Sequence, residues 1–221
     1  MRQSFWLVAV AAIFVTSLIT ANVIAVKVVS VAGLFFPAAI VIFPISYVIG
    51  DVLTEVYGFS TARRVIWLGF FCNLLFVAAV YVGGVLPGAP FFGDEGQSAY
   101  DRILGVAPRI LAASFAAYLV GEFANSAVLS RLKVATNGRW LWSRTISSTL
   151  VGQGLDTVIF ITLAGIVPAE ALLPTILTQW SLKVAYEVVA TPGTYAVVGI
   201  LKRKEGLDVY DRNVSLNPIR E

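Results

Sequence analysis

The feature that most constrains this chain is a series of six long apolar runs separated by polar segments. A helix that crosses the hydrocarbon core of a bilayer needs roughly 20 mostly apolar residues. The predicted spans are Phe5 to Val26, Leu34 to Ile49, Val65 to Leu86, Ile110 to Leu129, Thr145 to Val167 and Ile176 to Leu201. We therefore expect an all-α integral membrane protein, a bundle of six transmembrane helices over residues 1–204, followed by a polar and partly mobile tail over 205–221.

Composition agrees with a membrane environment. Apolar residues make up 58% of the chain and charged residues only 13%, whereas soluble domains carry about 25% charged residues. The first run is too long for the roughly 7–15 apolar residues of a signal peptide. Pro192-Gly193 predicts a kink or break in the sixth run, and the pattern of Gln97 to Leu104 predicts a short amphipathic helix in the longest outer loop.

Basic residues predict the orientation, because Lys and Arg accumulate on the cytoplasmic side. With the amino terminus inside, the cytoplasmic segments hold twelve of the 16 basic residues, namely Arg2, Arg63, Arg64, Arg131, Lys133, Arg139, Arg144, Lys202, Arg203, Lys204, Arg212 and Arg220. The outer loops hold only Arg102 and Arg109, and Lys27 is expected to reach the outer headgroups. Both termini are therefore predicted to be cytoplasmic, with the protein in the bacterial inner membrane.

Several classes of function are disfavoured by what the chain lacks. It has no histidine and one cysteine, Cys72, inside an apolar run. Histidine-dependent hydrolases and the usual imidazole metal sites are excluded. No basic stretch alternates with exposed aromatic residues, which disfavours nucleic acid as a partner. We expect no catalytic residue, no metal site and no cofactor, so an enzyme or an assembly factor is disfavoured.

Polar residues inside the predicted spans, or directly after the second one, are the main candidates for a binding site. An ionisable group at the centre of a span costs roughly 2.5–3.5 kcal/mol on insertion scales and usually marks a pathway. These residues are Asn22, Asp51, Glu55, Glu122, Asn125, Gln153, Asp156, Lys183 and Glu187. In each of the last three runs, two candidates lie three or four residues apart and therefore share one helix face. The pairs are Glu122 with Asn125, Gln153 with Asp156, and Lys183 with Glu187. At about 1.5 Å per residue, Glu122, Gln153, Asp156 and Glu187 lie roughly 12–18 Å inside their helices, which predicts a mid-membrane solute site.

Structural roles for the same residues compete with this prediction. The alternatives are a buried Lys183–Glu187 pair, hydrogen bonds between helices from Asn125 and Gln153, and an interfacial network of Asp51 and Glu55 with Arg63 or Arg64. Glu122 and Asp156 have no basic residue at helical spacing, which favours a functional role. Carboxylates and amides with one lysine suit a planar, hydrogen-bonding, largely uncharged ligand, on which an aromatic ring such as Tyr186 can stack.

The chain also resembles a known family. The segments that carry the resemblance are 21–27, 43–58, 62–67, 107–110, 121–125, 144–148 and 152–157, of which Gly50-Asp51-Val52-Leu53-Thr54-Glu55-Val56-Tyr57-Gly58 is the most specific. Over residues 5–204 the chain resembles the queuosine precursor transporter family. The resemblance implies uptake of 7-cyano-7-deazaguanine (preQ0) or a related deazaguanine such as preQ1. It also implies a six-helix architecture similar to the substrate-binding subunits of vitamin transporters, and a homodimer.

A deazaguanine fits the polar residues. Its N1–H and exocyclic amine are paired donors that one carboxylate can accept, which predicts that Glu122 or Asp156 binds this edge. Asn22, Asn125 and Gln153 are predicted to bind the remaining polar atoms. The alternative function is a substrate-binding subunit for another vitamin- or nucleobase-like solute that requires a separate ATPase, since the chain has no Gly-x-x-x-x-Gly-Lys-Ser/Thr loop.

Overall fold

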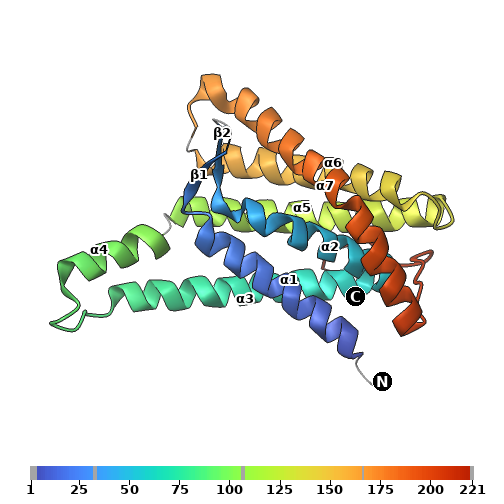
Figure 1. The fold of residues 1–221 in the computed structure, drawn as a ribbon, viewed down its shortest axis with the longest axis horizontal. Coiled ribbons are helices and arrows are strands. Elements are labelled where there is room, and N and C mark those ends of the chain that lie inside the picture. The colour runs from blue at the N-terminus through green and yellow to red at the C-terminus, as the bar shows by residue number, and fades with distance from the viewer. Residues whose placement is uncertain (1–3, 32–33, 106–107, 166, 220–221) are drawn as a thin grey trace.

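The computed structural model describes residues 4–31, 34–105, 108–165 and 167–219, and these are mostly helical (Figure 1). The elements in chain order are α1 (Phe5–Ile24), β1 (Val28–Val31), β2 (Leu34–Pro37), the 3-10 helix η1 (Ala38–Val41), α2 (Phe43–Tyr57), α3 (Phe59–Val85), α4 (Gly93–Leu104), α5 (Pro108–Ala135), α6 (Leu141–Ala164) and α7 (Ala169–Glu205). Among the described residues, α1, α3, α5, α6 and α7 are long and apolar enough to cross a membrane. These five helices correspond to five of the six predicted spans.

The second predicted span, Leu34 to Ile49, is wrong as a continuous helix. Its first residues form β2, which pairs antiparallel with β1 from Val31↔Leu34 to Val28↔Pro37. The cause is local, because Val28, Val29, Phe35 and Phe36 have β-forming side chains, and a proline disfavours helix in the residue before it. α2 begins only at Phe43, with a proline in its first turn, and continues past Asp51 and Glu55 to Tyr57.

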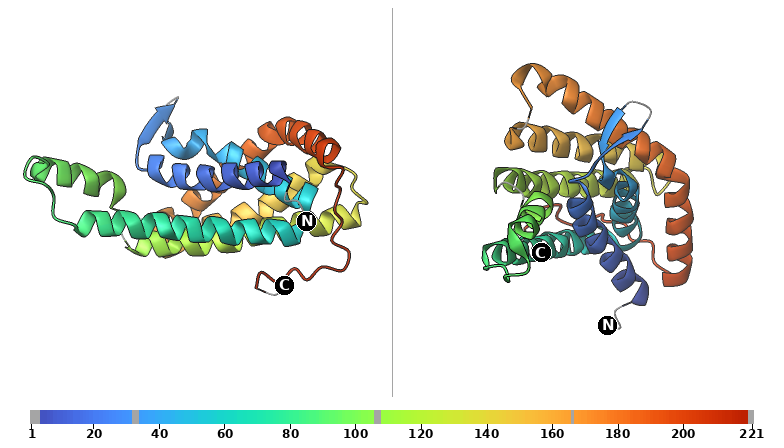
Figure 2. Two further views of the ribbon diagram at one scale, coloured as in Figure 1. Left: turned by 90° about the horizontal axis from the view of Figure 1, so that it is seen from below. Right: turned by 60° about the vertical axis from the view of Figure 1, so that its left-hand side comes forward.

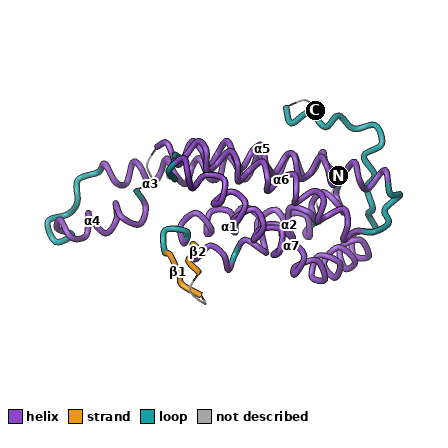
Figure 3. Tube along the Cα trace, turned by 90° about the horizontal axis from the view of Figure 1, so that it is seen from above, coloured by secondary structure: helices purple, strands orange, loops and turns teal. Residues whose placement is uncertain are grey.

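The hairpin and the termini lie at opposite ends of the helices. The β1–β2 hairpin and α4 lie at one end, here called the hairpin end, as Figures 1 and 3 show. The range predicted as amphipathic, Gln97 to Leu104, lies within α4. At the other end, the tail end, Ser4 Oγ donates to Glu205 Oε1, and the Tyr57 hydroxyl donates to the same oxygen at 3.4 Å. The start of α1 and the ends of α2 and α7 therefore lie together.

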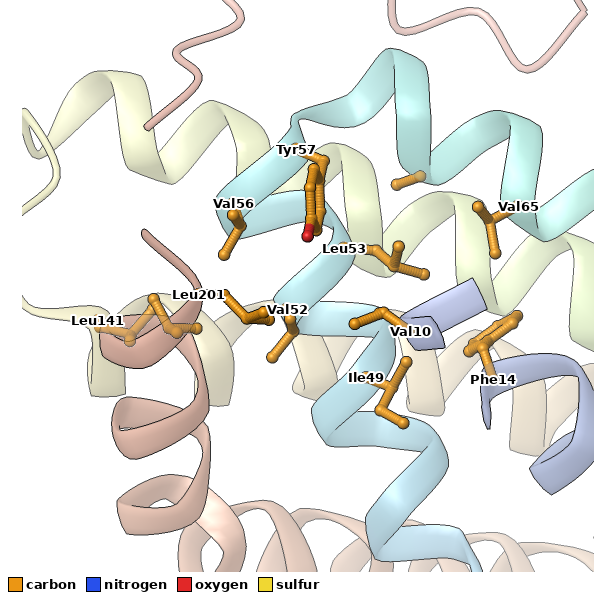
Figure 4. Close-up of a cluster of buried hydrophobic side chains, with 12 residues drawn as sticks. Val10, Phe14, Ile49, Val52, Leu53, Val56, Tyr57, Val65, Leu141 and Leu201 are labelled. Atoms are coloured by element: carbon orange, nitrogen blue, oxygen red, sulfur yellow. The ribbon is translucent and has the colours of Figure 1, made fainter. Parts of the chain in front are cut away.

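Apolar side chains join α2 to its neighbours near the tail end. Val52, Leu53 and Val56 of α2 are buried among residues of α1, α3, α6 and α7, such as Val10 and Leu201 (Figure 4). Because α2 is central to this cluster, its polar residues Asp51 and Glu55 are buried as well. The short helix is thus surrounded by the longer ones and places two acids inside the bundle.

α7 is continuous, although Pro174 and Pro192 lie within it. It changes direction along its length (Figure 2, right), which agrees with the predicted kink and not with a break. Proline has no N–H to continue the helical ladder. Near Pro192, the hydroxyls of Thr191 and Thr194 also donate to the carbonyl oxygens of Glu187 and Ala190, at 2.7 and 3.4 Å.

Glycines allow α5 and α6 to approach closely. A Cβ built at Gly152 would lie 2.6 Å from Asn125 Cβ and 2.8 Å from the Gly121 carbonyl oxygen. Small residues at such crossings let helix backbones pack directly in a membrane. The polar residues Asn125 and Asp156 flank these glycines, so the crossing fixes the distance between the polar faces of the two helices.

Replacing Gly152 by alanine should therefore force α5 and α6 apart. We expect the free energy of unfolding to fall by about 1–3 kcal/mol, the usual cost of overpacking, measured by thermal denaturation in detergent. The control is Gly199→Ala in α7, where an added Cβ would have no neighbour within 4 Å. Alanine is the better helix former, so this variant should be as stable as the parent or slightly more stable. Equal stability of the two variants would contradict the close crossing.

Candidate functional site

The structure brings together six of the predicted site residues from four helices. We call this set the polar layer; its members are Asp51 of α2, Glu122 and Asn125 of α5, Asp156 of α6, and Lys183 and Glu187 of α7. Asn125 Nδ2 donates to Asp51 Oδ1 at 2.8 Å, and Lys183 forms an ion pair with Asp156. A Cβ at Gly50 would lie 3.3 Å from Glu122 Oε2, so α2 packs directly against that carboxylate.

Lys183 has a different partner from the one that its spacing along the chain predicts. The predicted pair within α7, Lys183–Glu187, is wrong, because Lys183 Nζ binds Asp156 Oδ2 across the α6–α7 interface. Both partners are partly exposed, with 18% and 24% of their side-chain surface accessible. Asp156 therefore has a basic partner that helical spacing along its own helix did not reveal.

One part of the polar layer is deeply buried and contains acceptor oxygens to which no described group donates a hydrogen bond. Asp51, Asn125 and Glu187 are 1%, 7% and 0% exposed. Within the described residues, Asp51 Oδ2, Asn125 Oδ1 and both carboxylate oxygens of Glu187 have no hydrogen-bond partner. The Asp51 carboxylate and the hydroxyls of Thr145 and Thr149 lie next to the Glu187 carboxylate, but without hydrogen-bond geometry. Four buried acceptors without donors are costly in a protein interior, so they require an explanation.

The Glu122 carboxylate is in a different situation. It is half-buried, and in the described part of the chain no hydrogen bond or ion pair to it is found. Lys183 lies within electrostatic reach of Glu122 but is bound to Asp156. Tyr47 of α2 lies near Glu122, Asp156, Glu187 and Tyr186. Glu122 is therefore an acceptor without a hydrogen-bond partner among the described residues, and it lies within electrostatic reach of Tyr47 and Tyr118.

Two other predicted residues, Asn22 and Gln153, are not members of the polar layer. Asn22 of α1 donates through Nδ2 to Asn73 Oδ1 of α3 at 3.0 Å, so its amide donor joins two helices. Sequence reasoning missed Asn73, for which a lone amide in an apolar run was the only signal. Gln153 of α6 is 5% exposed and is flanked by the α5–α6 crossing at Gly152.

A second polar group, the tail-end ion cluster, is built around Glu55 of α2. Its cations are Lys133 of α5, Arg144 of α6 and Lys202 of α7. Arg144 binds both carboxylate oxygens, and Lys202 Nζ lies 2.7 Å from Oε1. Glu55, Lys133 and Arg144 are at most 2% exposed. The cations that bind Glu55 thus come from three other helices and not from the predicted Arg63 or Arg64, and one carboxylate connects four helices.

The tail after α7 packs against the tail end, although we expected it to be partly mobile. Arg63 and Trp67 of α3 donate to the carbonyl oxygens of Asn217 and Pro218, at 3.0 and 2.9 Å. Asp208 accepts from Lys133 and Lys202. Burial opposes ionisation of Asp208, but these two cations outweigh it and hold its pKa below the usual value. The tail is thereby fixed to α3, α5 and α7.

Asp211 makes the contact of the tail that is easiest to test. Its Oδ2 accepts from the backbone N–H of Phe59 at 2.8 Å and from Ser130 Oγ at 2.7 Å, so it caps the first turn of α3. We expect Asp211→Ala to lower the free energy of unfolding by about 1 kcal/mol, as for other lost caps, and to increase hydrogen exchange over the tail. Asn213→Ala, an exposed position two residues on, is the control. If both variants exchange like the parent, the tail is not held by this cap.

A groove at the hairpin end contains none of the nine predicted site residues. Its volume is about 540 Å³, and it lies between the end of α1, the hairpin and α4. Its walls are mostly apolar, with Lys27 and Arg102 at the edge. The groove is therefore distinct from the polar layer.

Comparison with known proteins agrees with this arrangement. A family model described as "Putative vitamin uptake transporter" matches residues 37–197. A Bacillus subtilis (strain 168) protein named "Probable queuosine precursor transporter" is 32% identical over 190 residues, which cover 85% of this chain and 82% of that protein. The Escherichia coli (strain K12) protein named "Queuosine precursor transporter" is 27% identical over 164 residues, or 74% and 69% of the two chains. No solved structure matches the chain.

Both the family model and the first of these relatives cover most of the chain. The regions that match include α2, α5, α6 and most of α7, which carry the whole polar layer. Five helices able to span a bilayer fit a transporter, and the matched proteins are transporters by name. The chain belongs to the queuosine precursor transporter family, and it is a multi-pass membrane transporter and not an enzyme.

Proposed function

We propose that this chain carries a deazaguanine precursor of queuosine, 7-cyano-7-deazaguanine or its aminomethyl relative, across the bacterial inner membrane into the cell. The names of the relatives support the substrate class. The observation on this chain that carries the proposal is the half-buried Glu122 carboxylate, which is bound by no described residue and lies beside Tyr47.

Glu122 suits the guanine edge better than Asp156 does. N1–H and the exocyclic amine of a deazaguanine are two parallel donors, and a free carboxylate offers two acceptors to match them. Hydrogen bonds to an ionised group are about twice as strong as neutral ones. Asp156 has one oxygen occupied by Lys183, whereas both oxygens of Glu122 are available. We therefore assign the edge to Glu122 and give Asp156 the role of holding Lys183.

The other groups of the site have supporting roles in the proposal. Tyr47 lies within electrostatic reach of Glu122 and of Tyr186, and either aromatic ring can stack on the flat ligand ring. Gln153 can both donate to the ring carbonyl and accept from a ring N–H. Asn22 is not part of the proposed site, because its amide donates a hydrogen bond to Asn73.

The proposed topology has six crossings with both termini in the cytoplasm. The hydrogen bond between Ser4 and Glu205 supports an even number of crossings, since it holds the start of α1 beside the end of α7. α1 runs from the tail end to the hairpin end, and η1 with the 15-residue α2 returns to Tyr57 at the tail end. The second half of the short α2 is buried by its neighbours, so this part of the helix does not need the apolar length of an ordinary span. The distribution of basic residues supports a cytoplasmic tail end.

Uptake by the purified chain in liposomes tests the function. We expect labelled 7-cyano-7-deazaguanine to accumulate without any other protein, and unlabelled cyano- and aminomethyl-deazaguanine to compete better than guanine. Uptake only after addition of a separate ATPase would favour the alternative, a substrate-binding subunit. A chain that neither transports nor is thermally stabilised by any deazaguanine would contradict the substrate, since a ligand that binds the folded state must stabilise it.

A further inference from the structure

We propose that Asp51, Asn125 and Glu187 form a binding site for a monovalent metal cation, of which Na⁺ is the physiological candidate, next to the substrate site. The role of this cation in transport rests on the function proposed above. The site itself does not depend on which solute is carried.

The geometry places oxygen acceptors from three helices together. Asn125 donates its Nδ2 to Asp51 Oδ1 at 2.8 Å, and its amide oxygen has no hydrogen-bond partner among the described residues. The Glu187 carboxylate lies next to Asp51, and the hydroxyls of Thr145 and Thr149 lie next to Glu187. All three principal side chains are more than nine-tenths buried. α2, α5 and α7 thus each contribute one side chain to a compact, water-poor site.

Every unpartnered atom in this group is an acceptor. They are Asp51 Oδ2, Asn125 Oδ1 and the two carboxylate oxygens of Glu187. A proton shared between two carboxylates makes one O–H···O bond and so satisfies only two of these four atoms. A hard cation is bound by several oxygens at once, so it can satisfy all four. The surplus of acceptors therefore favours a metal cation over a proton.

The charge of the polar layer favours the same ligand. Asp51 lies within electrostatic reach of Glu187 and Glu122, and Glu122 lies within reach of Asp156. Lys183 is the cation that reaches Glu122, and it is bound to Asp156. Buried charges without compensation are strongly unfavourable. Across the described residues no group of three or more acidic, histidine or cysteine ligands occurs. Two carboxylates with amide and hydroxyl oxygens suit a monovalent ion.

The position of this site gives a route for coupling. Asp51 lies within electrostatic reach of Glu122, and α2 packs on Glu122 through Gly50. A cation between Asp51 and Glu187 would reduce the negative charge around Glu122 and hold α2 against α5 and α7. Substrate affinity should then increase about tenfold in Na⁺, within the roughly 5–150-fold range of coupling between sites.

The test compares NaCl with choline chloride at equal ionic strength, first on the purified protein without substrate. Na⁺ should raise the melting temperature of the parent, and the shift should be lost in Asp51→Asn and Glu187→Gln. Glu170→Gln is the control, because this side chain is exposed at the start of α7 and lies outside the polar layer, so the variant should keep the Na⁺ shift. The comparison of the two salts on the parent protein stands even if one variant does not fold.

Uptake into liposomes is the second readout. An inward Na⁺ gradient should drive accumulation in the parent, and Glu170→Gln, an exposed position at the start of α7, should behave like the parent. Uptake that is equal in both salts, with no Na⁺ shift in melting temperature, would overturn the cation site and leave the proposed function intact. Uptake driven by a pH gradient alone would do the same and favour a proton. A Na⁺ shift without uptake of any deazaguanine would support the site and overturn the proposed function.

Discussion

Replacing Glu55 by glutamine should lower the free energy of unfolding by about 3–5 kcal/mol, the usual cost of breaking a buried ion pair on one side. Glutamine keeps the shape of the side chain but removes its charge. Arg144, which is 1% exposed and binds both oxygens of Glu55, then loses its carboxylate. Lys133 and Lys202 keep Asp208 as a partner, so the loss comes mainly from Arg144. Chemical denaturation in mild detergent measures it.

The control for this substitution is Glu95→Gln in α4, where the side chain is exposed. That variant should unfold like the parent, since exposed charges contribute about 0–1 kcal/mol. Lys202→Gln should have an intermediate effect, because its side chain is 25% exposed and water can replace part of its contact. If Glu55→Gln is as stable as Glu95→Gln, the tail-end ion cluster does not hold the four helices together.

The same cluster gives Glu55 a second expected effect, on transport. The cluster joins α2, α5, α6 and α7 at the tail end. The same four helices form the polar layer. Movement of a solute past the tail end requires these helices to separate there. We therefore expect Glu55→Gln to change the rate of uptake far more than the affinity for substrate.

The positions of five membrane helices could be predicted from the sequence because each depends on a local property, a long apolar run. The second span failed for an equally local reason. The run from Leu34 to Ile49 has the hydropathy of a helix, but β-forming residues and prolines divide it into a strand, a 3-10 turn and the start of α2. Average hydropathy does not detect such a division, whereas side-chain shape does.

The partners of the polar residues could be predicted only in part. Spacing along a helix places Lys183 and Glu187 on one face, but it does not say which face of α6 lies opposite. In the fold, α7 packs so that Lys183 forms its ion pair with Asp156 of α6, and Glu187 lies next to Asp51 of α2. Glu55 is a similar case, because its cations are distant in sequence and only the fold brings them together.

Substituting Glu122 by glutamine should remove the discrimination that the transporter makes through the exocyclic amine of its substrate. The matched ligands are 7-cyano-7-deazaguanine and the analogue that lacks this amine. A hydrogen bond to an ionised group contributes about 1.5–3 kcal/mol, so the parent should bind the complete ligand about 10–150 times more tightly. In Glu122→Gln the amide nitrogen faces a ring donor, so affinity for the complete ligand should fall most, while the analogue is affected less. Competition for binding to purified protein measures both.

Two further variants show whether the effect belongs to Glu122. Asp156→Asn leaves Lys183 without its ion pair, so it should weaken both ligands to a similar degree and preserve their ratio. Glu170→Gln should leave both affinities unchanged, because that side chain is exposed at the start of α7. If Asp156→Asn abolishes the discrimination while Glu122→Gln preserves it, the guanine edge is bound by Asp156. A parent protein that binds both ligands equally well would mean that no carboxylate of the polar layer reads the amine, and that the solute is recognised by its ring face alone.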